Sequence, residues 1–255
     1  MIKDLLILNE YFDKIYVITL HRADDRQKKV KHYFEGIDFE FFYGTDKLQL
    51  SMDELIDTKV FDPVKAKKMH RNSKEMPLGM IACSLSHREL YKEILAKGYE
   101  KVLIMEDDFV PADISAVVLR QMIAELPVNW ELVYWGYYMN ETPTVNMQIK
   151  KAYYFLMGLL RVIKWTPSQV LNVYPKKYSD HLQKAGFHNT THAYAVSKSA
   201  LPKLIAAQTP VCHNPDTLLS QLILDGKLNA YMTVPKVFEQ EIFRKDGNKH
   251  SYISG

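Results

Sequence analysis

The chain has 255 residues, of which 47% are hydrophobic and 25% are charged, and its formal net charge is +3 at pH 7. These values are typical of a soluble globular protein that is long enough to bury a sizeable core, in one large α/β domain or two small ones. The charge is too small to indicate nucleic-acid binding, so we expect no nucleic-acid partner. It suits an anionic ligand or an acidic membrane surface.

The sequence carries no sign of secretion or of membrane insertion. No stretch holds 18 uninterrupted apolar residues, and the acidic N-terminal segment lacks the pattern of a signal peptide. The two cysteines, Cys83 and Cys212, have neither a metal-binding nor a redox spacing. We interpret both as buried thiols and expect a reducing, cytoplasmic location.

The first elements in chain order are a strand at 16–20 and a helix that continues to about Phe34. Arg22 and Arg26 lie four residues apart where the strand turns into the helix. Guanidinium groups and helix N-terminal amides there can bind a nucleotide diphosphate or a base edge. A solvated, salt-bridged helix start is an equally good interpretation. A second strand is expected at 39–43.

Residues 47–78 look irregular, and their basic run at 65–74 predicts an exposed loop or a short helix. A longer helix is expected over 80–97, because its apolar residues approximate one stripe and Gly98 can end it. His87 falls in the first half of this helix. It is either a hydrogen-bonded structural histidine, which is the default, or a contact to a donor sugar or phosphate.

The stretch 101–111, with the sequence KVLIMEDDFVP, joins an apolar run to three consecutive acids, Glu106, Asp107 and Asp108. The short apolar run predicts a strand buried in a parallel sheet, and carboxylates at its C-terminal end lie where open α/β sheets bind ligands. Three adjacent acids repel one another unless a cation holds them, and Mg²⁺ or Mn²⁺ carrying substrate phosphates would do so. A solvated acidic turn carries about equal weight.

A helix at 114–127 and a strand at 130–135 follow, but residues 137–175 show no clear period throughout. Within them, 152–165 is the most apolar stretch of the chain, with basic residues at its ends. It is too short to span a bilayer, yet it can lie in a membrane interface with its basic residues at the headgroups. A buried core segment is the slightly favoured alternative.

The C-terminal part predicts a strand at 190–197, a helix at 199–208, a second helix that begins near Asp216, and a last strand at 230–235. A carboxylate at the start of a helix can cap it, and it can also point into a cleft as a general base. We find no repeat, low-complexity segment or linker, so one domain is the simplest account.

Six stretches, spanning roughly residues 15–240 in order, together resemble glycosyltransferase family 25, which includes bacterial lipooligosaccharide galactosyltransferases and collagen galactosyltransferases. They are IYVITLHRADDR, GMIACSLSHRELYKEIL, VLIMEDDFV, THAYAVSKSALPKLI, NPDTLLSQLI and VPKVFEQ. The Ser-His helix some twenty residues before Glu-Asp-Asp is the most specific part. In two departures, Thr19 stands where the family usually has Asn, and His21 where it has an acidic residue.

The resemblance implies a GT-A fold, a Rossmann-like α/β/α sandwich in one domain with a mixed, mainly parallel sheet. Residues 1–136 would form the half that binds the nucleotide sugar, and 137–255 the half that binds the acceptor. It also implies a UDP-sugar donor, most often UDP-galactose, and Mn²⁺ or Mg²⁺. The matching donor-side residues are Thr19, Leu20, Arg22, Arg26, Ser86, His87, Glu106 and Asp107.

Glu106 and Asp108 fall on the acidic motif of the family and would contact the metal, with His250 and His192 as further ligands or sugar contacts. Asp216 would be the base of an inverting transfer. The expected acceptor is a glycan or lipid-linked oligosaccharide of lipopolysaccharide type at the inner face of an anionic membrane. The alternatives are a metal-dependent phosphohydrolase and a non-catalytic nucleotide-sugar binder. Whether donor turnover depends on a glycan acceptor would distinguish all three.

Overall fold

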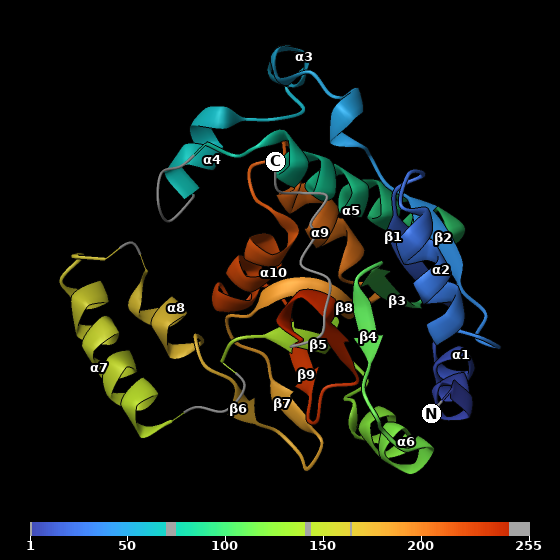
Figure 1. Ribbon diagram of the computed structural model, residues 1–255. Coiled ribbons are helices and arrows are strands. Elements are labelled where there is room, and N and C mark those ends of the chain that lie inside the picture. Colours follow the sequence, from blue (N-terminus) through green and yellow to red (C-terminus); the bar gives the residue numbers. More distant parts are fainter. Residues whose placement is uncertain (1, 70–74, 141–143, 164, 245–255) are drawn as a thin grey trace.

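The computed structural model describes residues 2–69, 75–140, 144–163 and 165–244. Within this part of the chain, eight strands form one sheet in the order β2–β1–β3–β8–β5–β9–β7–β6 (Figure 1). Their bounds are β1 Lys14–Thr19, β2 Glu40–Tyr43, β3 Lys101–Glu106, β5 Leu132–Tyr138, β6 Lys176–Lys177, β7 Leu182–Lys184, β8 Asn189–Ser197 and β9 Ala230–Thr233. Strands from both predicted halves of the chain therefore share one sheet.

The predicted mixed sheet is confirmed. Of the seven pairings that the described residues form in this sheet, β1 is parallel to β2 and β3, and β5 is parallel to β9, whereas the other four are antiparallel. The parallel share is three in seven because β8 runs against both of its neighbours, β3 and β5, and β7 runs against β9 and β6. A separate two-stranded ladder pairs β4 (Phe109–Pro111) with β10 (Phe238–Gln240).

Helices cover both faces of the sheet, which gives the α/β/α layers expected for a GT-A-like Rossmann fold (Figure 1). Leu103 and Met105 of β3 face one layer and Val102 and Ile104 face the other, because successive side chains of a strand point to opposite faces. The first layer holds α1 (Ile7–Tyr11), α2 (Asp24–Tyr33) and α6 (Ala116–Glu125), and the second holds α5 (Leu78–Lys97), α9 (Leu201–Ala207) and α10 (Pro215–Leu224).

Two segments that the sequence left without regular structure contain helices. Residues 47–78 include a short 3-10 turn at Lys47–Gln49, α3 (Met52–Asp57) and α4 (Pro63–Met69), while residues 137–175 include α7 (Val145–Leu159) and α8 (Pro167–Leu171). The irregular appearance of 47–78 therefore misled in part, although α4 covers the start of the basic run at 65–74, for which a short helix was one of the two expectations. Helices of five to seven residues are too short for a 3.6-residue period to stand out, and α7 carries apolar residues on more than one face.

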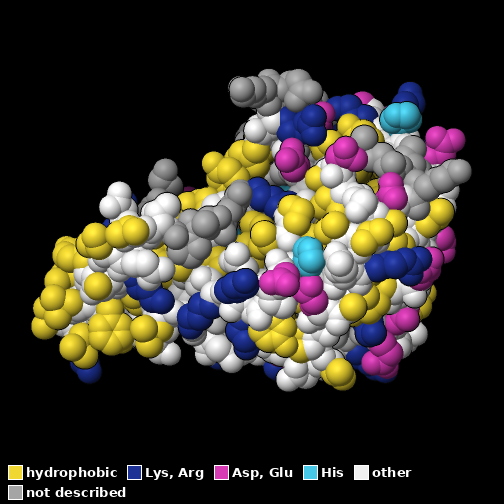
Figure 2. All heavy atoms as spheres, turned by 90° about the horizontal axis from the view of Figure 1, so that it is seen from below, with side chains coloured by type: hydrophobic (Ala, Val, Ile, Leu, Met, Phe, Trp, Pro, Cys, Tyr) yellow, Lys and Arg dark blue, Asp and Glu magenta, His cyan; other side chains and the backbone are white. Residues whose placement is uncertain are grey.

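α7 projects beside the body of the molecule and exposes most of its apolar side chains (Figure 2). An outward stripe consists of Val145, Ile149, Tyr153, Leu156 and Leu160, which are 77, 64, 58, 49 and 60% exposed. These positions lie within about 80° of one another on a helix that turns 100° per residue. The favoured expectation of a buried core segment at 152–165 is therefore wrong. Of the described residues in that segment, only Gly158 is buried.

α7 packs closely against the segment that leads into α8, at the position of Gly158. A Cβ at this position would lie 2.8 Å from the carbonyl oxygen of Trp165, so only glycine permits this close contact between α7 and the segment leading into α8. Among the described residues, there is no helix with both the length and the apolar character to cross a membrane.

Candidate functional site

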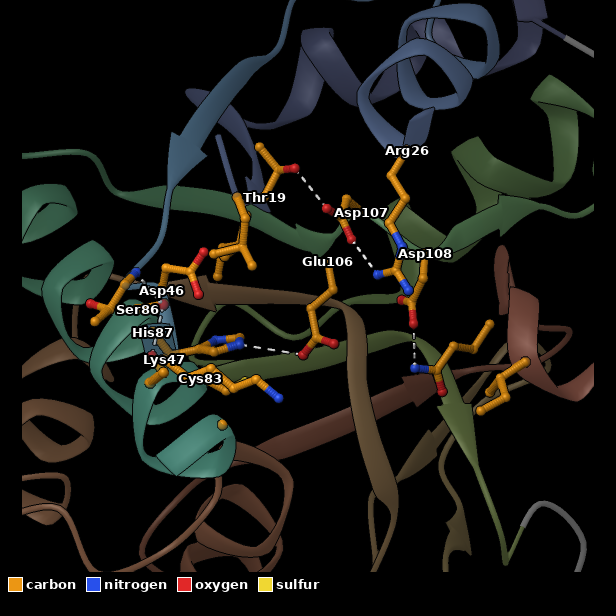
Figure 3. A pocket seen from close by; sticks show the side chains of 17 residues that line it. Thr19, Arg26, Asp46, Lys47, Cys83, Ser86, His87, Glu106, Asp107 and Asp108 are labelled. Atoms are coloured by element: carbon orange, nitrogen blue, oxygen red, sulfur yellow. Dashed lines mark hydrogen bonds and ion pairs between the residues drawn. The ribbon is translucent and has the colours of Figure 1, made fainter. Parts of the chain in front are cut away.

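A cavity of about 150 Å³ opens at the C-terminal ends of β1 and β3, against the first half of α5 (Figure 3). Ligands of open α/β sheets bind at this edge. The residues that line it are Ile18, Thr19, Leu20, Arg26, Thr45, Asp46, Lys47, Gly79, Ala82, Cys83, Ser86, His87, Glu106, Asp107, Asp108, Gln240 and Ile242. Seven of the predicted donor-side residues, together with Asp108, therefore meet in one place.

Asp107 is bound by the chain itself. Its Oδ2 accepts a hydrogen bond of 2.6 Å from the Thr19 hydroxyl, and its Oδ1 accepts one of 2.7 Å from Arg26 Nη1 (Figure 3). Burial raises the pKa of Asp107, and the charge of Arg26 counteracts this. These two hydrogen bonds join the end of β3 to Thr19 of β1 and to Arg26 of α2. Thr19, one of the two departures from the family pattern, therefore helps to position the acidic run.

Glu106 points the other way, toward α5. Its Oε1 accepts a hydrogen bond from the Thr191 hydroxyl and lies 3.3 Å from Nε2 of His87. Burial acts to raise the pKa of Glu106, but the contacts with His87 and Thr191 outweigh it, and the net pKa is lowered. On its far side, His87 Nδ1 lies 2.7 Å from the Tyr194 hydroxyl, which is 2.6 Å from the Tyr91 hydroxyl.

Asp108 is the least satisfied of the three acids. Gln240 Nε2 donates to its Oδ2 at 2.9 Å, but its Oδ1 is buried and has no hydrogen-bond partner among the described residues. Burial and the negative charge of Glu106 raise the pKa of Asp108 to about 7. The β4–β10 ladder brings Gln240 to this position.

The first turns of α5 form the wall opposite the acids. Gly79 lines the cavity in the first turn, so the positive end of a 20-residue helix faces it. The Ser86 hydroxyl donates to the Ala82 carbonyl and accepts from the Thr45 amide at 2.9 Å. A Cβ on Gly44 would lie 2.5 Å from Ser86 Oγ, so a glycine is needed where the chain passes this helix.

Asp216 lies outside the set of described residues that line the cavity. It occupies the first turn of α10, where its Oδ1 accepts from the Thr217 amide at 2.6 Å and its Oδ2 from the Thr190 amide at 3.4 Å. Burial raises the pKa of Asp216, an effect that the two amides reduce and the charge of Glu106 increases. These two hydrogen bonds hold the Asp216 side chain at the helix start. Its raised pKa makes the carboxylate more basic than that of an exposed aspartate.

The remaining predicted residues are placed as follows. Arg22 binds Asp46 through two hydrogen bonds of 2.5 and 3.1 Å and is likewise not among the described lining residues. Both ring nitrogens of His192 are engaged, by the Thr190 hydroxyl and the Phe238 carbonyl, so its predicted role as a ligand has no free nitrogen to support it. His250 lies outside the described residues.

The sequence interpretation missed several lining residues, among them Cys83, Lys47 and Gln240. Cys83 was expected to be buried, but it is half-buried and its side chain is part of the cavity wall. A signal for it was present, because Cys83 and His87 are four residues apart and thus share a face of α5. Gln240 gave no comparable signal, since it reaches Asp108 from 132 residues away.

Comparison with known proteins adds to this geometry. A family model described as Glycosyltransferase family 25 (LPS biosynthesis protein) matches residues 12–219. A glycosyltransferase 25 family member of Anopheles gambiae is 32% identical over 211 residues, which cover 81% of this chain and 30% of that protein. Procollagen galactosyltransferase 2 of Mus musculus is 25% identical over 201 residues, covering 77% of this chain and 28% of that protein.

A third relative, from Bos taurus, is named a probable inactive glycosyltransferase 25 family member 3. It is 23% identical over 210 residues, covering 77% of this chain and 29% of that protein. The chain thus spans less than a third of the length of these three curated relatives.

Proposed function

The chain belongs to glycosyltransferase family 25, and on that premise we propose that it transfers a hexose, galactose, from a UDP-sugar to a glycan acceptor of lipopolysaccharide type. The transfer would invert the anomeric centre and depend on Mn²⁺ or Mg²⁺. The observation that carries the proposal is the cavity at the strand ends, where three acids meet the N-terminal end of α5.

The acids fit a divalent cation. Arg26 already compensates the charge of Asp107, which leaves Glu106 and Asp108 without a cationic Lys or Arg partner among the described contacts. The Oδ1 atom of Asp108 is buried and has no hydrogen-bond partner among the described residues, so it can serve as a ligand. Hard cations prefer carboxylate oxygens as ligands. Asp108 and Glu106 would therefore hold the ion. Once bound, such an ion neutralises the diphosphate of the leaving nucleotide.

The protein groups around this position suit a nucleotide diphosphate. The N-terminal end of α5 offers backbone amides and a positive dipole to phosphate oxygens. Arg26 and Lys47 add cationic side chains to the lining. Thr19 and Leu20 at the end of β1 form the side of the cavity that would face the base and ribose.

Asp216 would supply the base. In the proposed step, the acceptor hydroxyl oxygen forms a bond to C1 of the donor sugar and Asp216 takes the hydroxyl proton. The bond between C1 and the diphosphate oxygen breaks, and its electron pair leaves with UDP. A base works best when its pKa lies nearer the working pH, and the raised pKa of Asp216 is in that direction.

α7 supports the further proposal that the acceptor is met at an anionic membrane. Lys150 of α7 and Arg161, just after the C-terminal end of this helix, are both exposed. An apolar face flanked by cations is the pattern of a helix that lies in a bilayer interface, with its charges at acidic headgroups. A lipid-linked acceptor would then be presented beside the site.

The experiment that tests the function measures UDP binding and sugar transfer over a panel of UDP-sugars, with Mn²⁺ or EDTA and with acceptors ending in galactose, glucose or N-acetylglucosamine. Metal-dependent transfer of one sugar supports the proposal. Donor hydrolysis that ignores the acceptor would instead indicate a phosphohydrolase, and metal-dependent binding without turnover a non-catalytic binder.

Asp108→Asn is the variant that addresses the metal. It removes the unpartnered charged oxygen while keeping an acceptor for Gln240. Metal-dependent UDP binding should be lost, and the folded state should survive, because a buried carboxylate with a raised pKa is replaced by a neutral group of the same shape. Unchanged metal-dependent binding in this variant would remove Asp108 from the proposed site.

A further inference from the structure

Cys83, His87 and Glu106 form a cluster on the inner wall of the cavity. Cys83 and His87 lie one turn apart on α5, and Glu106 comes from the end of β3 across from them. One ligand atom of each residue, the thiol sulfur, a ring nitrogen and a carboxylate oxygen, lies within 4.8 Å of the other two. This set differs from the oxygen ligands proposed for Mn²⁺ or Mg²⁺, because it includes sulfur and nitrogen.

His87 provides an independent sign that a ligand belongs here. Its side chain is 1% exposed, and its Nε2 has no hydrogen-bond partner of acceptable geometry among the described residues, although it points at Glu106 (Figure 3). The separation of 3.3 Å between Nε2 and Glu106 Oε1 is close to that of two ligands about 2.0–2.1 Å from one tetrahedral Zn²⁺ ion. A cation between them would satisfy the buried nitrogen.

The surroundings of His87 match those of a metal-binding histidine. Such a histidine donates its other ring N–H to an oxygen, which fixes the tautomer and the ring orientation. Nδ1 of His87 lies 2.7 Å from the Tyr194 hydroxyl, and Tyr91 holds that hydroxyl from the other side. The ring is thus oriented with Nε2 toward the cluster before any ion arrives.

We propose that Cys83, His87 and Glu106 bind a borderline-soft divalent ion of the Zn²⁺ class, with a fourth position open to the cavity. Thiolate and imidazole favour Zn²⁺ over Mg²⁺ or Mn²⁺. On binding, the Cys83 thiol releases its proton to solvent and its sulfur forms the bond to the metal. Glu106 belongs to both sets, so, if the proposed function holds, Zn²⁺ at this cluster would compete with the ion that serves the diphosphate.

Cobalt(II) is the probe, because it takes zinc sites and has a visible spectrum. The full chain, reduced and without nucleotide, is titrated with Co²⁺, and absorbance is followed in the thiolate-to-cobalt charge-transfer and ligand-field regions. We expect one ion per chain, a charge-transfer band, and displacement of the cobalt by Zn²⁺ and not by Mg²⁺. Absence of the band in the folded protein would overturn the proposal.

The two cysteines of the chain make the assignment unambiguous. Cys83→Ser should abolish the charge-transfer band, whereas the matched control Cys212→Ser, at a buried thiol outside the cavity, should keep it. His87→Gln should weaken Co²⁺ binding by at least about tenfold. A band that persists in Cys83→Ser would assign the ion to Cys212 and refute the cluster.

Thermal unfolding of each variant shows whether it folds, and His87→Gln provides a second test if Cys83→Ser does not. The titration contains no donor, acceptor or Mn²⁺. Its outcome is therefore separate from that of the glycosyl-transfer experiment, and either proposal can fail while the other stands.

Discussion

Arg26 Nη1 donates to Asp107 Oδ1 at 2.7 Å, so a cation of the chain compensates the central acid of the Glu-Asp-Asp run. The pair is mostly buried, with side chains 11 and 9% exposed. With Thr19 on its other oxygen, Asp107 has both oxygens engaged. The neighbours on either side, Glu106 and Asp108, have no ion pair with Lys or Arg among the described residues. The acidic run thus divides into one carboxylate that an arginine compensates and two that we propose bind the metal.

The burial of the Arg26–Asp107 pair predicts that replacing Arg26 or Arg22, four residues apart, lowers the free energy of unfolding by unequal amounts. Arg26→Ala leaves the Asp107 charge buried and uncompensated, and we expect it to lower the free energy of unfolding at pH 8 by about 3 kcal/mol. Arg22→Ala breaks the more exposed pair with Asp46, for which we expect about 1 kcal/mol or less. Urea denaturation of both variants measures the difference. Equal losses would show that burial does not distinguish the pairs.

A second prediction concerns acid stability. His188 is fully buried, and its ring is fixed as neutral, because Nδ1 donates to the Met139 carbonyl while Nε2 accepts from the Gly186 amide. Burial lowers the pKa of His188 from 6.5 to about 4. Between these values the unfolded chain binds a proton that the folded chain does not. The free energy of unfolding should therefore fall as the pH falls from 6.5 to 4.

The full effect of such a shift is about 3 kcal/mol for one histidine. His192, whose pKa burial also lowers to about 4, should add to it. Chemical denaturation at intervals across this pH range gives the slope, and His188→Asn, which keeps an amide donor for Met139, should make the slope shallower. An identical slope in wild type and variant would mean that His188 does not carry the acid sensitivity.

The sequence predicted the elements that build the site but only part of what its residues do. The apolar run before Glu106 and the stripe of α5 are local patterns, and each was enough to place its element. The partnership of Arg26 with Asp107 joins residues 81 positions apart, and no local pattern contains it. The same holds for Asp108, because Gln240, which donates to its Oδ2, lies 132 positions away in the sequence.

The prediction that residues 152–165 are buried was wrong for a different physical reason. Its apolar residues were visible in the sequence, but composition alone does not say what covers an apolar face. Burial was therefore favoured, whereas the folded chain leaves the stripe exposed and packs α7 onto its neighbour through Gly158.

A third prediction concerns the base. Asp216→Asn should lower kcat for transfer by about 10²–10⁴-fold and leave UDP binding unchanged, because Asp216 is not among the described residues lining the donor cavity. Asp225→Asn, at the C-terminal end of the same helix, is the control and should leave both kcat and UDP binding unchanged. Since a base must be ionised and burial raises the pKa of Asp216, the acid limb of the kcat profile should lie above the usual range of an aspartate. Near-normal turnover in Asp216→Asn would assign the base elsewhere.

The last prediction concerns the α7 stripe and its membrane. Ile149→Ser combined with Leu156→Ser removes two apolar side chains that are 64 and 49% exposed. We expect binding to anionic vesicles, measured by co-sedimentation at low salt, to fall at least about tenfold, because each side chain loses about 1 kcal/mol or more of burial in the interface. The melting temperature should not change, since neither side chain packs in the core.

Val117→Ser combined with Val128→Ser is the matched control, because both valines are exposed but lie on and after α6. It should leave vesicle binding intact. Lys150→Gln with Arg161→Gln should weaken binding to anionic vesicles only, by about fivefold for each charge. If the α7 variant instead changes the oligomeric state and leaves vesicle binding unaltered, a second copy of the chain covers the stripe. That outcome would exclude membrane docking by α7, because the apolar stripe would serve self-association.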